Sequence, residues 1–351
     1  MSKFSKERRV SMSGSGGTPT VSIVMPCFNS EATVVRAITS VQAQSMPDWF
    51  LTIVDDGSTD KTIASIEGHL KRGGRENITI IRLRKNVGVA EARNRGILQS
   101  TGEWIAFFDA DDEMDPRHLE RLLDQADADV DVVICGRTVV QGDGTESHEH
   151  SAALGVYTGA RASLLAMCDK LTPFPWDRIT RRHLFDAGGF PQGAVRCEDS
   201  MTNIVLLSRA RKVVSIAASG IRYFVSGGSI TWGRIYRLSD ATVAWQYMAA
   251  HVPAHLTKGV HAPAFSCARA VVALTIGQTA MLRGGADAEP QRRQDALSAA
   301  TECRAWIRVR DVMGTLAVNP RLGLAVVLFK FFPRRYAIVY RRYVARHYAS
   351  S

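Results

Sequence analysis

Residues 104–113 read WIAFFDADDE, an apolar run that ends in an acidic turn. The five apolar residues at 104–108 are typical of a buried strand. Side chains two residues apart in an extended segment project to the same side, so Asp109 and Asp111 can converge. Crowded carboxylates repel one another unless a cation neutralises them, and their hard oxygen atoms suit Mg²⁺ or Mn²⁺. The stretch therefore predicts a divalent-metal site; the alternative is an exposed acidic turn that favours the start of the next helix.

Similar apolar segments lie on both sides of this stretch. Strands are predicted at 21–25, 49–54, 78–83 and 130–135, with a helical pattern in each interval. Strands of this length that alternate with helices imply βαβ units and a mostly parallel sheet, so the predicted fold class is α/β. The polar motifs of the chain come directly after these strands, which is where open α/β sheets bind ligands.

The residues before each helical pattern predict where the helices begin. Ser30 is expected to cap the first helix, and Ser58 or Thr59 the second, because a hydroxyl oxygen can accept a free N–H group of the first turn. Asp115 and Pro116 are expected to be the N-cap and the first residue of a later helix. Beyond about residue 225 the pattern is mainly helical.

Two further motifs follow predicted strands. In DDGSTD (55–60), two successive acids at a strand end can accept hydrogen bonds from a base N–H or from ribose hydroxyls. In PCFN (26–29), Pro26 is expected to end the strand, and the next residues can present backbone groups and an aromatic edge to a base. A plain turn with Phe28 in the core explains this second motif equally well.

The composition is that of a globular protein. The 351 residues are 46% hydrophobic and 22% charged, which excludes a disordered, collagen-like or coiled-coil chain and indicates about two domains. The six cysteines form no CxxC pair, and we interpret them as reduced thiols. We find neither a signal-peptide pattern nor a run of about 18 apolar residues, so a cytoplasmic protein is expected.

The net charge of +10 is unevenly distributed. Residues 1–20 contribute +3, and residues 312–351 contribute +7 because they hold seven basic residues and no acid, so the chain between them is neutral. A nucleic-acid-binding domain would need a basic face on its folded body, so this distribution argues against one. It favours contact of the basic ends with an anionic surface.

Four motifs in a fixed order resemble the signature of glycosyltransferase family 2. They are PCFN (26–29), DDGSTD (55–60), NVGVAEARN (86–94) and DADD (109–112). The resemblance covers residues 21–230 and implies a GT-A fold, which is a Rossmann-like sheet flanked by helices. It further implies an inverting transfer of a sugar from a nucleotide-diphosphate sugar, with UDP as the expected nucleotide and Mn²⁺ or Mg²⁺ as the metal.

The match also implies roles for individual residues. Asp56 is expected to hold the base, with Asp55 nearby. Asp109 is expected to lie near the ribose, and Asp111 to bind the metal and the pyrophosphate. Arg93 either supports the diphosphate or only holds its helix in place. The set expected around the nucleotide sugar is Pro26, Phe28, Asn29, Asp55, Asp56, Arg93 and Asp109.

Two later segments, 175–190 and 196–207, resemble the acceptor-side elements of the family. Asp199 would be the general base that deprotonates the acceptor hydroxyl as it attacks the anomeric carbon. Glu198 would be a structural or acceptor-binding neighbour. The alternative is that both acids are ordinary first-turn residues of a helix. Trp176 either stacks on the acceptor sugar or fills the core.

The sequence leaves two other functions open. A sugar-phosphate nucleotidyltransferase would have a glycine-rich GxGxRxxP loop after the first strand, where this chain has PCFN. A catalytically inactive sugar-nucleotide-binding or scaffold protein would not need Asp111 and Asp199, and both are intact. The QxxRW motif of processive synthases is absent, so the addition of a single sugar is expected.

The chain is predicted to comprise a disordered basic tail (1–20), a GT-A domain (21–230) and a mainly helical region (231–351). In the final segment 322–344, apolar clusters alternate with basic residues, and Pro333 separates two short helices. Neither helix is long enough to span a bilayer, but the composition suits an interfacial helix; the alternative is a helix packed on the protein. Acceptors in this family are often lipid-linked sugars. The resemblance therefore implies a saccharide or lipid-linked acceptor and a peripheral position on the cytoplasmic face of an anionic membrane.

Overall fold

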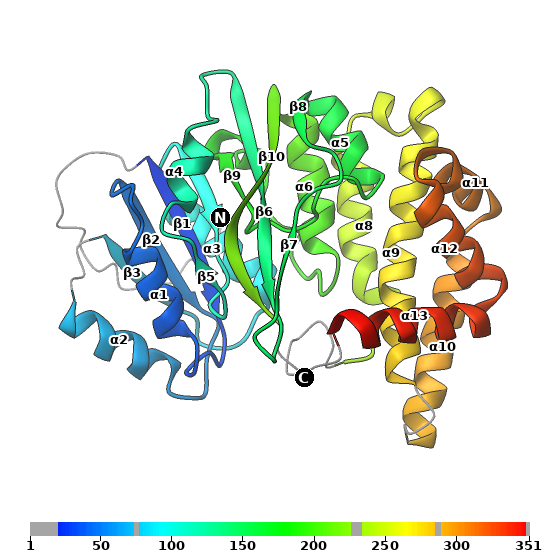
Figure 1. Ribbon diagram of the computed structural model, residues 1–351, viewed down its shortest axis with the longest axis horizontal. Helices are drawn as coiled ribbons and strands as arrows, with labels where there is room; N and C mark the ends of the chain where they lie inside the picture. The colour runs from blue at the N-terminus through cyan, green and yellow to red at the C-terminus, as the bar shows by residue number, and fades with distance from the viewer. Residues whose placement is uncertain (1–19, 74–76, 226–233, 285–288, 349–351) are drawn as a thin grey trace, which may run out of the picture.

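The computed structural model describes residues 20–73, 77–225, 234–284 and 289–348. A twisted sheet with its flanking helices occupies the left and centre of Figure 1, and a group of helices from the C-terminal region occupies the right. The predicted tail of residues 1–20 lies outside the described residues, except for Thr20. The predicted domain boundary at residue 230 lies outside them as well.

The elements have the following bounds. The strands are β1 (Val21–Cys27), β2 (Trp49–Asp55), β3 (Ile78–Arg82), β4 (Trp104–Phe107), β5 (Glu113–Met114), β6 (Val130–Val140), β7 (Glu146–Glu149), β8 (Gly155–Thr158), β9 (Arg178–Arg181) and β10 (Lys212–Phe224). The helices are α1 (Val34–Gln42), α2 (Thr62–Arg72), α3 (Val89–Gln99), α4 (His118–Leu123), α5 (Gly159–Met167), α6 (Glu198–Arg209), α8 (Ser239–His251), α9 (Ala262–Arg283), α10 (Pro290–Trp306), α11 (Val309–Val318), α12 (Pro320–Phe331) and α13 (Pro333–Tyr348).

The sheet has the strand order β3-β2-β1-β4-β9-β6-β10-β5, with β7 paired to β6 and β8 to β10. β1 to β4 are parallel, as predicted. Beyond β4 the sheet is mixed, because β9 is antiparallel to both β4 and β6 and the short strands β5, β7 and β8 also pair antiparallel. The predicted parallel pairing is therefore found in β1–β4 and again between β6 and β10, with the antiparallel β9 between these two parts. β9 has four residues, RITR, too few for an apolar pattern to reveal a strand.

The order of the strands reverses next to β1. The chain passes from β1 outward to β2 and β3, and then returns to place β4 on the other side of β1. In open α/β sheets, ligands bind at the carboxyl ends of the strands beside such a reversal. The ends of β1, β2 and β4, where three of the four motifs lie, flank this position.

The centre of the sheet is closely packed. All seven residues of β1 are buried, as expected for a parallel strand that is covered on both faces. α3 approaches β1 closely because Gly96 has no side chain: a Cβ atom there would lie 2.2 Å from the side chain of Val24. This contact brings the residues of α3 that follow the NVG turn near the end of β1.

The prediction that Pro26 ends its strand is wrong, since β1 continues to Cys27. Proline has no N–H to donate to a neighbouring strand. However, β4 pairs only with residues 21–24, and the N–H of Phe108 bonds the carbonyl oxygen of Val24 at 3.0 Å as the last link on that side. Pro26 faces the same side two residues later, beyond this last link, so its missing N–H removes no bond of that ladder.

Two predicted helix caps are wrong because the loops after β1 and β2 bond to each other. α1 begins at Val34, and Ser30 contributes only its carbonyl oxygen to the turn before it. α2 begins at Thr62, whose N–H bonds a carboxylate oxygen of Asp60 at 2.9 Å. The hydroxyl of Ser58 accepts an N–H of the loop after β1 at 2.9 Å instead of capping α2.

The third predicted cap is also displaced. α4 begins at His118, three residues after Asp115. The Asp115 carboxylate accepts the N–H of Arg117 at 2.9 Å and pairs with Arg121 at 3.1 Å. Pro116 therefore lies in a turn that precedes the helix and not at its first position.

A second hydrophobic cluster lies between α5, α6 and the helices of the C-terminal region. α9 is central to it and contacts α5, α8, α10, α11, α12 and α13. α5 and α6, which belong to the predicted GT-A domain, contribute Leu164, Met167, Met201, Ile204 and Val205. The helical region is thus packed on these two helices, and the division at residue 230 stays a prediction.

Among the described residues, one segment is long and apolar enough to cross a membrane by length and composition. It is Gly259–Arg283, which contains α9 and has a mean hydropathy of 1.4. No such segment is expected from the sequence. Because 56% of its most apolar window is buried inside the protein, α9 has the character of a core helix.

Candidate active site

Asn29 joins the loops that follow β1 and β2. Its side-chain oxygen accepts the N–H of Thr59 at 2.9 Å, and its own N–H donates to the hydroxyl of Ser58 at 2.9 Å. Its backbone is left-handed, with φ of 49°, a conformation that asparagine adopts more readily than most residues. Asn29 therefore aligns the two loops, and its contact with a nucleotide stays a prediction.

Asp55 and Asp56 are buried and hold backbone turns. A carboxylate oxygen of Asp55 lies 3.3 Å from the backbone nitrogen of Ser58, across the turn. Asp56 accepts the N–H groups of Val87 at 2.8 Å and Gly88 at 2.9 Å, directly before α3. Burial raises the pKa of Asp56, although these two N–H groups act in the opposite direction. Asp56 thus positions the glycine turn, and a base would have to share the lone pairs of the same carboxylate.

The ring of Phe28 is 38% exposed beside this joined loop pair. The alternative of a core phenylalanine in PCFN is therefore wrong. An exposed aromatic face at the end of β1 can stack on a planar base. Pro26, in contrast, is buried within β1, so it can act on a nucleotide only by shaping the loop.

An open pocket of about 430 Å³ lies beside the turn that precedes α3. It is lined by Leu83, Arg84, Lys85, Val87, Glu91, Arg95, Gln192 and Gly193. Three of these side chains are basic, and the one acid, Glu91, pairs with Arg95 at 2.9 Å. The lining therefore has a net positive charge, which attracts anionic ligands. Val87 belongs both to this pocket and to the turn held by Asp56.

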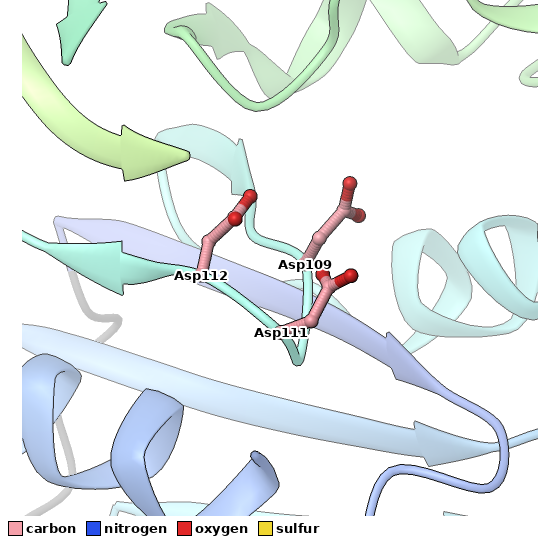
Figure 2. Close-up of side chains that lie close together, drawn as sticks. All are labelled: Asp109, Asp111 and Asp112. Atoms are coloured by element: carbon pink, nitrogen blue, oxygen red, sulfur yellow. The ribbon is translucent and has the colours of Figure 1, made fainter. Parts of the chain in front are cut away.

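Three carboxylates gather at the turn after β4. One oxygen from each of Asp109, Asp111 and Asp112 lies within 4.8 Å of the others. Figure 2 shows Asp109 and Asp111 side by side, while Asp112 leans toward the end of β10. One oxygen of the buried Asp112 accepts the N–H of Phe224 at 3.1 Å. Its other oxygen has no hydrogen-bond partner among the described residues.

The crowding of these acids changes their pKa values. The pKa of Asp111 is raised to about 6; the side chain is exposed on one side, but the surrounding protein still limits its hydration, and Asp109 repels it. Burial, followed by repulsion from its two neighbours, raises the pKa of Asp112 well above its usual range. A divalent cation would oppose both effects. The convergent oxygens and the unpaired buried oxygen of Asp112 therefore fit Mg²⁺ or Mn²⁺.

Arg36 of α1 braces the acidic turn. Its guanidinium donates to the backbone carbonyl of Asp111 at 2.5 Å and pairs with Glu113 at 3.4 Å. It also lies over the ring of Phe224, 3.9 Å from the centroid. These contacts hold the backbone of the turn without using the carboxylates of the acidic cluster.

Arg93 of α3 joins the acidic turn to the start of α6. Its side chain is 3% exposed, and its guanidinium lies 3.4 Å from an oxygen of Asp109 and 3.8 Å from Glu198. It forms a closer, hydrogen-bonded ion pair with Asp199. From the sequence, Arg93 is expected either to support a diphosphate or to hold its own helix in place. The structure shows that it bridges acids from two distant segments.

Glu198 and Asp199 both lie in the first turn of α6, so their placement agrees with the alternative of first-turn residues. That alternative does not account for the ion pairs that both acids form with Arg93. Burial and the charge of Asp199 raise the pKa of Glu198 to about 8. Burial also raises the pKa of Asp199, against the opposing charge of Arg93. A carboxylate with a raised pKa accepts a proton more readily, which is the property required of a general base.

Trp176 is 3% exposed and lies in an aromatic stack. Its ring is nearly parallel to those of Phe174 and Tyr223, with centroid distances of 4.8 and 5.5 Å. The ring therefore fills the core. Contact of Trp176 with an acceptor sugar stays a prediction, and it would require the edge of this stack to become accessible.

Replacement of Arg93 by methionine is expected to lower the free energy of unfolding by about 2–4 kcal/mol, because it leaves three partly buried carboxylates without a counter-charge. The loss should be larger at pH 8 than at pH 5. An acid whose pKa is raised in the folded state lowers the stability of the protein as the pH rises and the acid ionises. The positive charge of Arg93 reduces this effect for Asp199 and Glu198. Urea unfolding at the two pH values measures both effects.

Arg95→Met is the matched control for this measurement. Arg95 lies on the same helix and pairs with Glu91 at 2.9 Å near the surface. A helix pair with this spacing of four residues contributes about 0.3–0.5 kcal/mol and should show little dependence on pH in this range. Equal losses in the two variants would contradict the bridging role of Arg93.

Sequence reasoning missed the bridge of Arg93, the brace of Arg36 and the participation of Asp112. One signal for Arg93 was available: it lies three residues after Ala90 and four before Ile97, on the apolar side of its helix. An arginine on such a face needs an acidic partner. No local signal marks Arg36, because its main contact is with a backbone carbonyl.

Residues 22–188 match the family model described as glycosyl transferase family 2. EpsH of Bacillus subtilis (strain 168) is 28% identical over 172 residues, which are 48% of this chain and 49% of EpsH. The succinoglycan biosynthesis protein ExoO of Rhizobium meliloti (strain 1021) is 35% identical over 136 residues, 38% of each chain. The chain thus spans half or less of the length of these curated relatives.

Solved structures resemble the chain over most of its length. Residues 1–349 of TarS from S. aureus, in complex with UDP-GlcNAc, align with a TM-score of 0.65 at 19% identity, over 93% of this chain and 90% of that one. The mannosyltransferase PcManGT from Pyrobaculum calidifontis, in complex with GDP-Man and Mn²⁺, aligns with a TM-score of 0.50 at 18% identity, over 96% and 89%. At these identities the likeness establishes the fold, a mixed GT-A sheet with helices and a helical C-terminal region.

Proposed function

We propose, from the match of residues 22–188 to the family model described as glycosyl transferase family 2, that the chain is a member of this family and an inverting, non-processive sugar transferase. It moves one sugar from a nucleotide-diphosphate sugar, with UDP as the nucleotide, to a saccharide or lipid-linked acceptor. The product belongs to a surface polysaccharide or a related glycan, and the reaction takes place in the cytoplasm.

One observation carries this proposal: Arg93 contacts both Asp109 of the acidic turn and Asp199 of α6. The acidic turn is the place expected for the donor diphosphate, and Asp199 is the expected proton acceptor. A shared guanidinium keeps the two within reach of one reacting centre. Arg93 is thus a positioning residue that couples the donor side to the acceptor side.

The proposed reaction is a single displacement. Asp199 takes the proton of the acceptor hydroxyl, whose oxygen attacks the anomeric carbon from the side opposite the diphosphate. The bond between that carbon and the diphosphate oxygen breaks, and its electron pair leaves with the diphosphate. The configuration at the anomeric carbon is inverted, and no covalent enzyme intermediate is needed.

The donor side is assigned to the ends of β1, β2 and β4. Asp111 would hold Mn²⁺ or Mg²⁺ together with Asp109 and Asp112, and the bound cation would stabilise the charge that develops on the diphosphate. The exposed ring of Phe28 would stack on the base. The loop junction at Asn29, Asp55 and Asp56 would hold the remainder of the nucleoside.

A thermal-unfolding screen tests the donor. UDP together with Mn²⁺, each in excess, is expected to raise the unfolding midpoint by several degrees, because a ligand at 100 times its dissociation constant stabilises by about 2.7 kcal/mol. GDP or dTDP should give smaller shifts, and UDP without metal should give little. If none of the nucleotides shifts the midpoint, the donor assignment is wrong. If UDP–Mn²⁺ binds but no sugar reaches any acceptor of a broad panel, the inactive binding protein becomes the better interpretation.

A further inference from the structure

The C-terminal helices present an exposed face on which arginines and apolar side chains alternate. As predicted, two helices meet at Pro333: α12 ends at Phe331, and Pro333 is the first residue of α13. We call the surface formed by Phe331, Phe332, Arg334, Arg335, Ile338 and Val339 the basic apolar face; all six side chains are exposed. Its four apolar side chains are 49–56% exposed, and a group of this kind marks a contact surface.

The opposite side of α13 is anchored to the protein. Tyr336 is buried, and its hydroxyl donates to the side-chain oxygen of Gln278 in α9 at 3.0 Å. Its ring also packs edge-on against Phe329 of α12. Because residues four apart share a side of a helix, this anchor points Arg334 and Ile338 outward together. The basic apolar face is therefore held in one orientation and is not covered by the rest of the described chain.

The charge of this face has no acidic counterpart. Residues 312–351 contain no acid, and neither Arg334 nor Arg335 has an acidic partner in the part of the chain that the structure describes. Lys330, by contrast, points inward, where its ammonium donates to the carbonyl oxygens of Arg304 at 3.0 Å and Ile307 at 2.5 Å. Exposed positive charge thus lies on the arginines of α13 and on Arg321 at the start of α12, and not on Lys330.

The two ends of α13 lie differently with respect to the sheet. In Figure 1, α13 begins on the outer side of the helical region and runs along its lower part toward the sheet. The basic apolar face belongs to the end of α12 and the start of α13, so it lies on the side of the helical region away from the sheet.

We propose that the basic apolar face docks on an anionic phospholipid surface. Arg334 and Arg335 contact the headgroup phosphates, while Phe331, Phe332 and Ile338 enter the interface. Nucleic acid would be bound by the charges alone and would not account for the exposed apolar side chains. The docking does not require the proposed sugar transfer, so it can be tested without donor or acceptor.

Flotation of the full chain with vesicles tests the proposal. Vesicles of equal parts phosphatidylglycerol and phosphatidylcholine should bind the protein strongly, and pure phosphatidylcholine vesicles weakly. The Arg334→Gln/Arg335→Gln variant should bind the anionic vesicles roughly 30-fold less tightly, because each basic residue near an anionic surface contributes about fivefold. Lys71→Gln/Arg72→Gln, at the exposed end of α2, is the matched control and should bind like the unaltered chain.

A second variant separates the apolar contribution. Ile338→Ser/Val339→Ser should reduce binding several-fold at both low and high salt, since insertion of apolar groups is not screened. In high salt, in contrast, the arginine variant should bind the anionic vesicles nearly as tightly as the unaltered chain does, because salt screens the contribution of the charges. Circular dichroism and the unfolding midpoint of each variant show whether α13 remains folded.

Several results would overturn the proposal. They are equal flotation of the arginine variant and the α2 control, no binding of the full chain to anionic vesicles, or tighter binding to a single-stranded RNA than to the vesicles. A dimer in solution that Ile338→Ser/Val339→Ser dissociates would assign the face to a second copy of this chain instead.

Discussion

Turnover of the Asp199→Asn variant is expected to fall by roughly 10²–10⁴, the usual contribution of a positioned proton acceptor. The amide keeps the shape of the side chain but cannot take the proton of the acceptor hydroxyl. Arg93 retains its contacts with Asp109 and Glu198, so the site should stay assembled. Initial rates with a UDP-sugar and Mn²⁺, and the donor dissociation constant from calorimetry, measure the effect.

The pH dependence of the reaction gives an independent readout. A general base must be ionised, so the turnover of the unaltered chain should fall as the pH drops through the pKa of Asp199, which burial raises. This acidic limb should disappear in Asp199→Asn. Glu198→Gln is the matched control: it lies next to Asp199 and contacts the same arginine, but its loss should be much smaller. If donor binding collapses in Asp199→Asn, Asp199 belongs to the nucleotide site and the division of roles is wrong.

The Asp111→Asn variant is expected to lose metal-dependent turnover by several orders of magnitude. The substitution removes a negative charge from the place where three carboxylates lie within 4.8 Å of one another. Rates measured as a function of Mn²⁺ concentration should show no recovery at high metal, and calorimetric binding of UDP should lose its dependence on Mn²⁺.

The stability of Asp111→Asn should not fall. The pKa of Asp111 is raised to about 6, so its ionised form at neutral pH weakens the folded state, and a neutral amide removes that effect. Glu113→Gln is the control from the same turn, because Glu113 pairs with Arg36 and Arg222 and is not part of the acidic cluster. Near-normal turnover in Asp111→Asn would show that the metal is held elsewhere or is not needed.

The N-terminal half of the fold follows from local sequence signals. The strands β1, β2 and β4 are largely apolar runs, because strands covered on both faces bury nearly every residue, and this pattern is visible in the sequence. β3, at the edge of the sheet, is also mostly apolar but only half-buried. Helix starts are harder to predict. Ser58 has the right residue type for a cap, but a loop from a different strand takes its hydroxyl. Such competition between partners is decided only when the two loops meet.

The placement of the site residues could also be predicted only in part. Asp109 and Asp111 are adjacent in sequence to a strand end, so their convergence could be predicted from the alternation of side chains. Asp112 projects differently and reaches the cluster because the N–H of Phe224 in β10 holds one of its oxygens. Trp176 could be assigned to a sugar or to the core from sequence. It stacks on Phe174, two residues before it, and on Tyr223 of the distant strand β10, and these contacts place it in the core.

The sequence by itself determined the kind of chemistry: the residue types at the strand ends, their order along the chain, and the excess of positive charge after residue 311. Only the tertiary structure decided which charges act together. Arg93 meets Asp109 and Asp199, and Lys330 turns inward while Arg334 and Arg335 face outward. The physical reason is that a buried charge requires a partner, and that partner can come from any segment that the packing brings near, however distant in the chain.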